Sequence, residues 1–162
     1  MRYAQITPFE ICNGKGAGVS LFVQGCRFCC KGCFNSEAWD FNGGKEWTQE
    51  TEDKFFELID TPYIKRVAIL GGEPLHPLNI DTVINIAKKT KEIYPNKQVY
   101  IWTGFLFDNI INKDILKYAD VIIDGKYVDE LKDLTLKWRG SSNQKIWEKD
   151  SNGRWCCDDK KK

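Results

Sequence analysis

The chain has 162 residues, of which 42% are hydrophobic and 29% charged, a composition that excludes a disordered or fibrous protein and suits one globular domain. Its 24 basic and 23 acidic residues leave a net charge of +1, which gives no overall field favouring nucleic acid or an anionic membrane. The N-terminus lacks the apolar core of a signal peptide, and no apolar run approaches the ~20 residues of a membrane span. We therefore expect a cytoplasmic protein with neither nucleic acid nor membrane as a partner.

Short apolar, β-branched segments predict four strands, at 19–25, 65–70, 98–102 and 119–124. Apolar residues at helical spacing predict three helices between them, at 48–60, 79–94 and 108–118. Strands that alternate with helices of this length indicate βα units around a parallel sheet. We expect residues 1–150 to form a single domain and residues 151–162 to form a polar C-terminal tail.

The segments that follow the four strands carry most of the chemistry of the chain. They are "GCRFCCKGC" (25–33), "GGEP" (71–74), "TGF" (103–105) and "DGK" (124–126). In parallel βα architectures, ligands bind at the carboxyl ends of the strands. The sequence therefore predicts one composite site on one rim of the sheet.

Four cysteines fall within eight positions of the first of these segments: Cys26, Cys29, Cys30 and Cys33. In a reducing compartment, clustered cysteines indicate metal binding or catalysis rather than disulfides. A structural zinc site usually separates two Cys-x-x-Cys pairs by about a dozen residues or more, whereas here the two pairs adjoin. A zinc knuckle completed by Cys156 or Cys157 remains open. The ferredoxin run Cys-x2-Cys-x2-Cys-x3-Cys does not fit.

The spacing that fits is Cys-x3-Cys-x2-Cys, formed by Cys26, Cys30 and Cys33 with Cys29 as a bystander. Three thiolates on a four-iron cluster leave one iron without a protein ligand, and an open position is typical of catalytic metal sites. This spacing after the first strand, with GGEP after the second, resembles the radical S-adenosylmethionine superfamily. The glycines of GGEP allow a close backbone approach to a ligand, and the Glu73 carboxylate can accept from an amine.

The resemblance implies an α/β fold in which parallel βα repeats form a partial, incomplete TIM-type barrel. It implies a 4Fe-4S cluster with Cys26, Cys30 and Cys33 as metal ligands, and S-adenosylmethionine on the open iron. The implied cofactor-binding residues are Gly71, Gly72 and Glu73 for the methionine, Gly32, Cys33 and Phe34 near the adenosyl group, and Thr103 for the ribose or carboxylate.

Further segments resemble the activating components of anaerobic ribonucleoside-triphosphate reductases over about residues 3–147. They include "NGKG" (13–16), "CFNSEAW" (33–39), "WTGF" (102–105) and "WRGSSNQKIW" (138–147). The resemblance implies that the cluster receives an electron from a flavodoxin-like or other low-potential donor. The 5′-deoxyadenosyl radical made from S-adenosylmethionine then takes hydrogen from a glycine of the large reductase subunit.

Other assignments remain open at this point. One is another small radical S-adenosylmethionine enzyme, such as pyruvate formate-lyase activase or carboxy-deazaguanine synthase, and the other is a non-catalytic zinc-binding adaptor. The chain departs from the family pattern in the loop 13–18, where Lys15 and Gly18 replace a usual proline and arginine. Asp124 and Lys126 lie on the predicted rim with either a cofactor-binding or a structural role.

Overall fold

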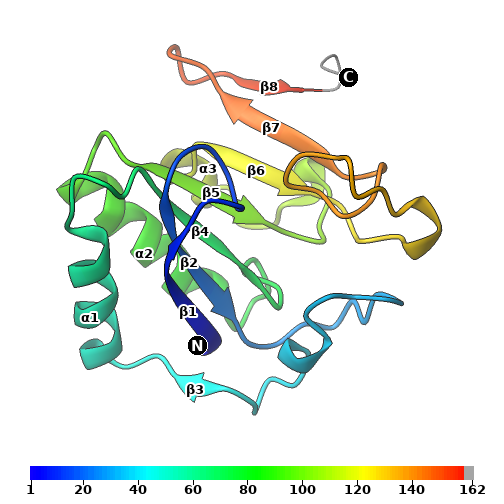
Figure 1. Ribbon diagram of the computed structural model, residues 1–162, viewed down its shortest axis with the longest axis horizontal. Coiled ribbons are helices and arrows are strands. Elements are labelled where there is room, and N and C mark those ends of the chain that lie inside the picture. The colour runs from blue at the N-terminus through cyan, green and yellow to red at the C-terminus, as the bar shows by residue number, and fades with distance from the viewer. Residues whose placement is uncertain (159–162) are drawn as a thin grey trace.

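The computed structural model describes residues 1–158, so the lysines that end the predicted tail lie outside it. An eight-stranded sheet in the order β3-β1-β2-β4-β5-β6-β7-β8 forms the centre of the molecule (Figure 1). The strands are β1 (Arg2–Glu10), β2 (Gly18–Val23), β3 (Lys45–Glu46), β4 (Arg66–Gly71), β5 (Gln98–Trp102), β6 (Val121–Asp124), β7 (Lys145–Lys149) and β8 (Trp155–Cys157). The helices are α1 (Gln49–Ile59), α2 (Ile80–Ile93) and α3 (Ile115–Tyr118), with 3₁₀ turns η1 (Ser36–Ala38), η2 (Phe107–Asn109) and η3 (Asp129–Leu131).

The four predicted strands are confirmed as β2, β4, β5 and β6, and they pair in parallel at the centre of the sheet. The flanking strands are antiparallel: β1 pairs with β2, and β7 pairs with β6. The fold is therefore mixed α/β. A TIM barrel is built from parallel strands that are each followed by a helix, and this sheet has antiparallel flanks, so the partial barrel remains a prediction.

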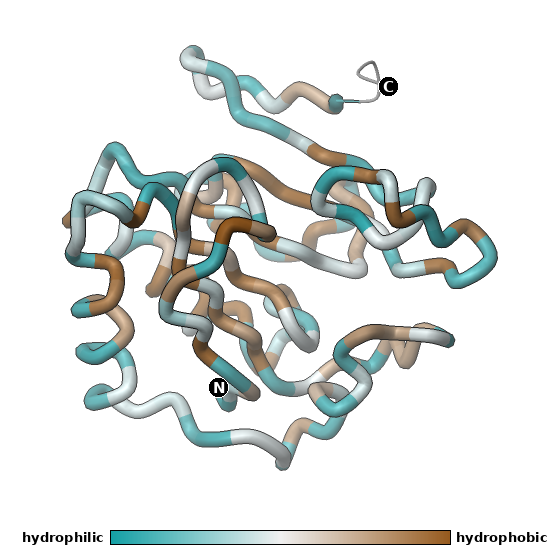
Figure 2. Tube along the Cα trace, in the orientation of Figure 1, coloured by the Kyte–Doolittle hydropathy of each residue, from teal (hydrophilic) through white to brown (hydrophobic). Residues whose placement is uncertain are grey.

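The two faces of the sheet differ in composition because side chains alternate along each strand. Aliphatic side chains of the central strands, such as Val67, Ile69 and Ile101, join residues of α1 and α2 in the larger buried cluster. The opposite face carries a smaller cluster around Leu70 and Tyr100, against which Trp102 and Trp138 pack. In Figure 2 the hydrophobic stretches of the chain follow these central strands.

The helices predicted at 48–60 and 79–94 are confirmed as α1 and α2. The Thr48 hydroxyl begins α1 by accepting a hydrogen bond from the backbone N–H of Thr51 at 3.2 Å, as an N-cap should. Val83, Ile86 and Ala87 form the buried stripe of α2.

The helix predicted at 108–118 is wrong in its first part, because only Ile115–Tyr118 is α-helical. Short polar side chains compete there for backbone groups. Asn112 Oδ1 accepts from the N–H of Asp114 at 3.0 Å, and Asp124 Oδ2 accepts from the N–H of Phe107 at 2.8 Å. These bonds stabilise turns instead of a longer helix.

The antiparallel strands β1 and β7 were not predicted, and neither was β8. Within the predicted tail, Trp155–Cys157 form β8 and pair with β7. No helix in the described part of the chain, residues 1–158, has the length and apolar character needed to cross a membrane.

Candidate iron–sulfur and cofactor site

The carboxyl ends of the four parallel strands line one cavity of about 350 Å³. Cys26 follows β2, Gly72 follows β4, Thr103 follows β5 and Gly125 follows β6, and all four contribute to its wall. The segment after β2 and the segment between β6 and β7 project beyond the same end of the sheet (Figure 1). The structure thus brings the four segments together on one rim of the sheet, where the sequence predicts a single composite site.

The cysteine-bearing loop, residues 25–39, is closed at its base by its own backbone. The N–H of Gly25 donates to the carbonyl of Ala38 at 2.7 Å, and the N–H of Cys26 donates to that of Trp39 at 3.1 Å. The loop therefore leaves the sheet and returns beside it, which fixes the region where its cysteines lie.

Three of the four clustered cysteines, Cys26, Cys30 and Cys33, line the cavity. Cys29 does not line it. Cys29 is exposed, has a left-handed backbone with φ of 48°, and lines a second groove together with Cys26 and Arg27. The same three sulfurs that fit the sequence spacing therefore face one space, and the fourth faces another.

Burial changes the acidity of two of these thiols. Burial raises the pKa of Cys26 to about 11, although hydrogen bonds from the backbone N–H groups of Phe28 and Cys29 oppose the rise. Burial likewise raises the pKa of Cys30, and the charge of Cys33 adds to this rise. A metal that bound these thiols would displace their protons.

Within residues 1–158, no three His, Cys, Asp or Glu side chains gather closely enough to surround a single ion. The N–H of Asn35 also donates to Cys33 Sγ at 3.4 Å, and hydrogen bonds to sulfur are one means of tuning a cluster. Three thiols that line one cavity, one of them accepting a backbone hydrogen bond, are a donor set that fits an iron–sulfur cluster.

The GGEP loop packs against the start of the cysteine loop, backbone to backbone. The N–H of Glu73 donates to the carbonyl of Gly25 at 2.8 Å. A Cβ on Gly71 would lie 2.7 Å from the N of Val23, and a Cβ on Gly72 would lie 2.5 Å from the carbonyl oxygen of Gly25. Glycine is needed at both positions because no side chain fits between the two segments.

Glu73 is almost fully buried, and its carboxylate joins the ends of β4 and β5. Oε1 accepts from Thr103 Oγ1 at 2.7 Å and from the N–H of Leu75 at 2.9 Å, while Oε2 accepts from the N–H of Gly104 at 2.7 Å. Burial raises the pKa of Glu73 to about 7, although these hydrogen bonds oppose the rise. Thr103 is therefore a partner of Glu73 as well as a cavity residue.

The remaining predicted residues divide into two groups. Phe34 and Lys126 line the cavity; Phe34 is 67% exposed and its ring lies 5.6 Å from that of Tyr127. Gly32 does not line it, but its φ of 74° turns the chain between Cys30 and Cys33. Asp124 is structural, because its oxygens accept from the backbone N–H groups of Phe107 and Lys145.

Several cavity residues were not predicted as such, notably aromatic ones. Trp102 Nε1 donates to the carbonyl of Trp138 at 2.7 Å, and Trp138 has a left-handed φ of 56°. Together with Arg139 they line the cavity. The cavity lies on the face of the sheet opposite α1 and α2, which we call the open face. The sequence contained enough to predict Trp102 as a cavity residue, since it precedes Thr103 at the end of a predicted strand. Trp138 and Arg139 lie outside the predicted strands, so nothing in the sequence indicated that their side chains face the cavity.

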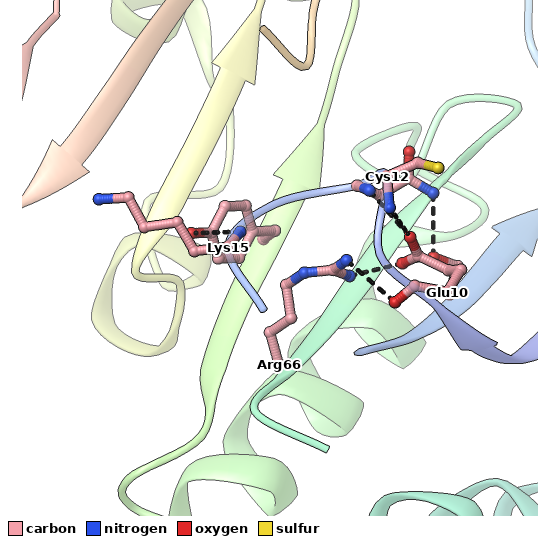
Figure 3. A network of polar contacts seen from close by, with 7 residues as sticks. Glu10, Cys12, Lys15 and Arg66 are labelled. Atoms are coloured by element: carbon pink, nitrogen blue, oxygen red, sulfur yellow. Dashed lines mark hydrogen bonds and ion pairs between the residues drawn. The ribbon is translucent and has the colours of Figure 1, made fainter. Parts of the chain in front are cut away.

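A buried ion pair lies at the other end of this open face (Figure 3). Arg66 Nη1 lies 2.5 Å from Glu10 Oε1, which also accepts from Ser20 Oγ at 2.7 Å. A Cβ on Gly18 would collide with the guanidinium of Arg66. The space beside Gly18 is thus filled by the side chain of Arg66 from β4. Asn13, on the same loop, reaches the cavity.

The site and the comparisons agree on a class of protein. The family model described as a 4Fe-4S single cluster domain matches residues 12–147, so the chain is an iron–sulfur protein. The chain is 39% identical over 150 residues to the anaerobic ribonucleoside-triphosphate reductase-activating protein of Vibrio cholerae, covering 90% of this chain and 97% of that protein.

Proteins of the same name from a phage and from Escherichia coli are also similar. The one from Enterobacteria phage T4 is 39% identical over 96% of this chain and 98% of its own length. The one from Escherichia coli K12 is 37% identical over 90% of this chain and 97% of its own length. The chain belongs to the family of anaerobic ribonucleoside-triphosphate reductase-activating proteins.

Proposed function

We propose that this protein activates an anaerobic ribonucleoside-triphosphate reductase by generating a radical on a glycine of the large reductase subunit. Membership of the activating-protein family carries this proposal. Its structural support is the cavity, which combines three thiols, a glycine-rich loop and a buried carboxylate at the carboxyl ends of parallel strands.

In this proposal Cys26, Cys30 and Cys33 hold a 4Fe-4S cluster, and S-adenosylmethionine occupies the rest of the cavity. Bound there, the cluster would supply the one electron for reductive cleavage of the cofactor's sulfonium, the chemistry that removes a hydrogen atom from the glycine. The support for the ligand set is that these three sulfurs share one cavity, whereas Cys29 lies outside it.

The residues of the chain orient the cofactor and shield the radical. Gly71 and Gly72 bring backbone groups near the methionine portion, and the Glu73 carboxylate attracts its ammonium group. Phe34 offers a ring for the adenine, and the Thr103 side chain lies near the ribose or carboxylate. Gly32 contributes the turn that brings Cys33 toward the cavity.

The rest of the fold has a place in the same proposal. The open face of the sheet is the interior of a partial TIM-type barrel formed by residues 1–150, and residues 151–162 are the polar C-terminal tail, of which Trp155–Cys157 pair with β7. Trp102 and Trp138 form an aromatic wall of the cavity on this face. A reducing cytoplasm is the compartment in which such a centre persists.

Two partners are needed. The glycine-bearing segment of the large subunit approaches the mouth of the cavity, where Phe34 is exposed. A flavodoxin-like or other low-potential protein supplies the electron. The second groove is a suitable position for this donor, because Cys26 lines both the groove and the cavity. A donor there reaches the cluster while the cavity is filled.

The direct test is glycyl radical formation. Anaerobically purified protein with cluster, S-adenosylmethionine and a chemical reductant is mixed with the reductase large subunit, and the product is examined by electron paramagnetic resonance. We expect a glycyl radical signal that requires all four components. Its absence with an intact cluster would reject the proposal. Protein that contains zinc and no acid-labile sulfide would indicate the zinc-binding adaptor instead.

A further inference from the structure

Asn79 begins α2, yet it does not cap the helix. Asparagine is favoured at this position because its side chain accepts from the first free N–H groups of a helix, but here no side-chain cap bond forms. The side chain is 2% exposed. Its Nδ2 instead donates to two backbone carbonyls outside the helix, that of Gln24 at 3.1 Å and that of Glu73 at 3.0 Å.

The two acceptors belong to the two loops on which the proposed chemistry depends. Gln24 lies two residues before Cys26 and immediately precedes the cysteine loop, and Glu73 is the acidic residue of GGEP. Because one amide nitrogen serves both carbonyls, Asn79 bridges the loops directly. The neighbouring backbone bond between the N–H of Glu73 and the carbonyl of Gly25 brings the same two segments together.

Gln24 extends this bridge to the far end of the cysteine loop. Its side chain is 3% exposed, and its Nε2 donates to the carbonyls of Glu37 at 3.1 Å and Asp40 at 2.7 Å. Two buried amides therefore connect GGEP with both ends of the cysteine loop. Neither Asn79 nor Gln24 lines the cavity.

We propose that Asn79 is a positioning residue that sets the spacing between the cysteine loop and the GGEP loop, and hence the alignment of S-adenosylmethionine on the cluster. This inference rests on the proposed function. A buried carbonyl left without its donor is costly, so the loops move apart when the amide is lost. The methionine portion would span both loops, which makes its binding sensitive to their separation, since displacements of about 1 Å can cost 100-fold in reactivity.

The test compares three variants without using the reductase. Asn79→Asp keeps the shape of the side chain but presents oxygen to both carbonyls, and Asn79→Ser keeps one donor for two acceptors. Asn96→Asp is the matched control, because Asn96 is exposed in the turn before β5, at the opposite end of the strands. For each protein, iron and sulfide content are measured, and S-adenosylmethionine is titrated while the cluster spectrum is followed by electron paramagnetic resonance.

We expect Asn79→Asp to retain its iron and its cofactor-free spectrum while its Kd for S-adenosylmethionine rises about 10- to 100-fold, the range for outer-shell partners of metal sites. Asn79→Ser should show a smaller rise and Asn96→Asp none. An unchanged Kd in both Asn79 variants would overturn the inference, as would loss of iron in both. A wild-type protein that binds no S-adenosylmethionine would reject the proposed function itself, and the inference with it.

Discussion

The two faces of the parallel sheet are made by alternate residues of the same strands, yet they serve different purposes. On the helix-covered face, residues such as Ile69 and Ile101 are completely buried among aliphatic side chains. On the open face, β4 and β5 carry Arg66, Tyr100 and Trp102. The helix-covered face is an apolar core, whereas the open face combines an ion pair, an aromatic wall and a cavity.

This difference shows how stability and chemistry are separated within one strand. Burial of apolar surface contributes ~25 cal/mol per Å², and it is concentrated on the face with the helices. The open face can then carry polar groups and a cavity, both of which reduce stability elsewhere in proteins. Substitutions on the two faces should therefore affect different measurements.

The largest effect is expected at the rim of the open face. Cys30→Ala should abolish cluster binding and reductase activation because it removes one of three proposed ligands. Cys29→Ala is the matched control, since Cys29 lies outside the cavity, and it should retain the cluster. Iron and sulfide analysis of the anaerobically reconstituted proteins checks this. Equal loss in both variants would contradict the ligand set.

On the helix-covered face, Ile101→Ala should cost about 2–5 kcal/mol of unfolding free energy, the usual range for a buried aliphatic side chain truncated to alanine. Ile101 is 0% exposed and lies in the larger buried cluster. Anaerobic urea denaturation measures the loss. The Kd for S-adenosylmethionine should stay unchanged, and a tenfold rise in it would show that the two faces are not independent.

The ion pair tests the polar part of the open face. Glu10→Gln should cost about 3 kcal/mol, because it leaves the buried Arg66 without its counter-charge. Glu50→Gln is the control, since it removes the exposed ion pair with Lys54, and it should leave the free energy of unfolding nearly unchanged. Equal small losses in urea denaturation would indicate that the buried pair has no special role.

The same pair predicts a dependence on pH. Burial by itself would raise the pKa of Glu10, but hydrogen bonds from Arg66, Ser20 and the backbone N–H of Asn13 outweigh it and lower the pKa from 4.5 to about 2. A lowered pKa contributes stability above pH 4.5, and that contribution is lost as the pH falls from 4.5 towards 2. The stability difference between wild type and Glu10→Gln should therefore shrink across this window, as measured by urea denaturation at several pH values.

The smallest effect is expected at the aromatic wall. Trp102→Phe keeps an aromatic ring but removes the hydrogen bond to the carbonyl of Trp138, which should cost about 1 kcal/mol. Urea denaturation of the variant gives the value. A loss above about 3 kcal/mol, as for a core residue, would mean that the open face is packed like the helix-covered one.

The sequence was sufficient to predict the parallel strands and the segments that meet at their ends. Apolar runs such as "VAIL" (67–70) predict buried strands without knowledge of distant contacts. The rule that ligands bind at the carboxyl ends of parallel strands requires only the order of strands and helices. The spacing of Cys26, Cys30 and Cys33 distinguishes them from Cys29 in the sequence alone. Local patterns of this kind are contained within a few consecutive residues.

Other features depended on contacts between distant segments, which no local pattern records. The antiparallel strand β7 exists because it pairs with β6, and Asp124 fixes the turn that precedes the helix expected at 108–118 by accepting from the N–H of Phe107. The role of Asn79 also depends on distance in sequence, since it joins carbonyls 55 and 6 residues away.

By itself, the sequence determined the cysteine spacing, the GGEP loop and the βα order, because short-range spacing and hydrophobic periodicity are properties of neighbouring residues. The tertiary structure decided which cysteines face the cavity and which aromatic residues line it. It also placed the Arg66 side chain beside Gly18. The Asn79 side chain, which could have capped α2, instead bonds to the carbonyls of two loops. The direction of a side chain in a loop is set by what packs against it, and only the folded chain brings those partners together.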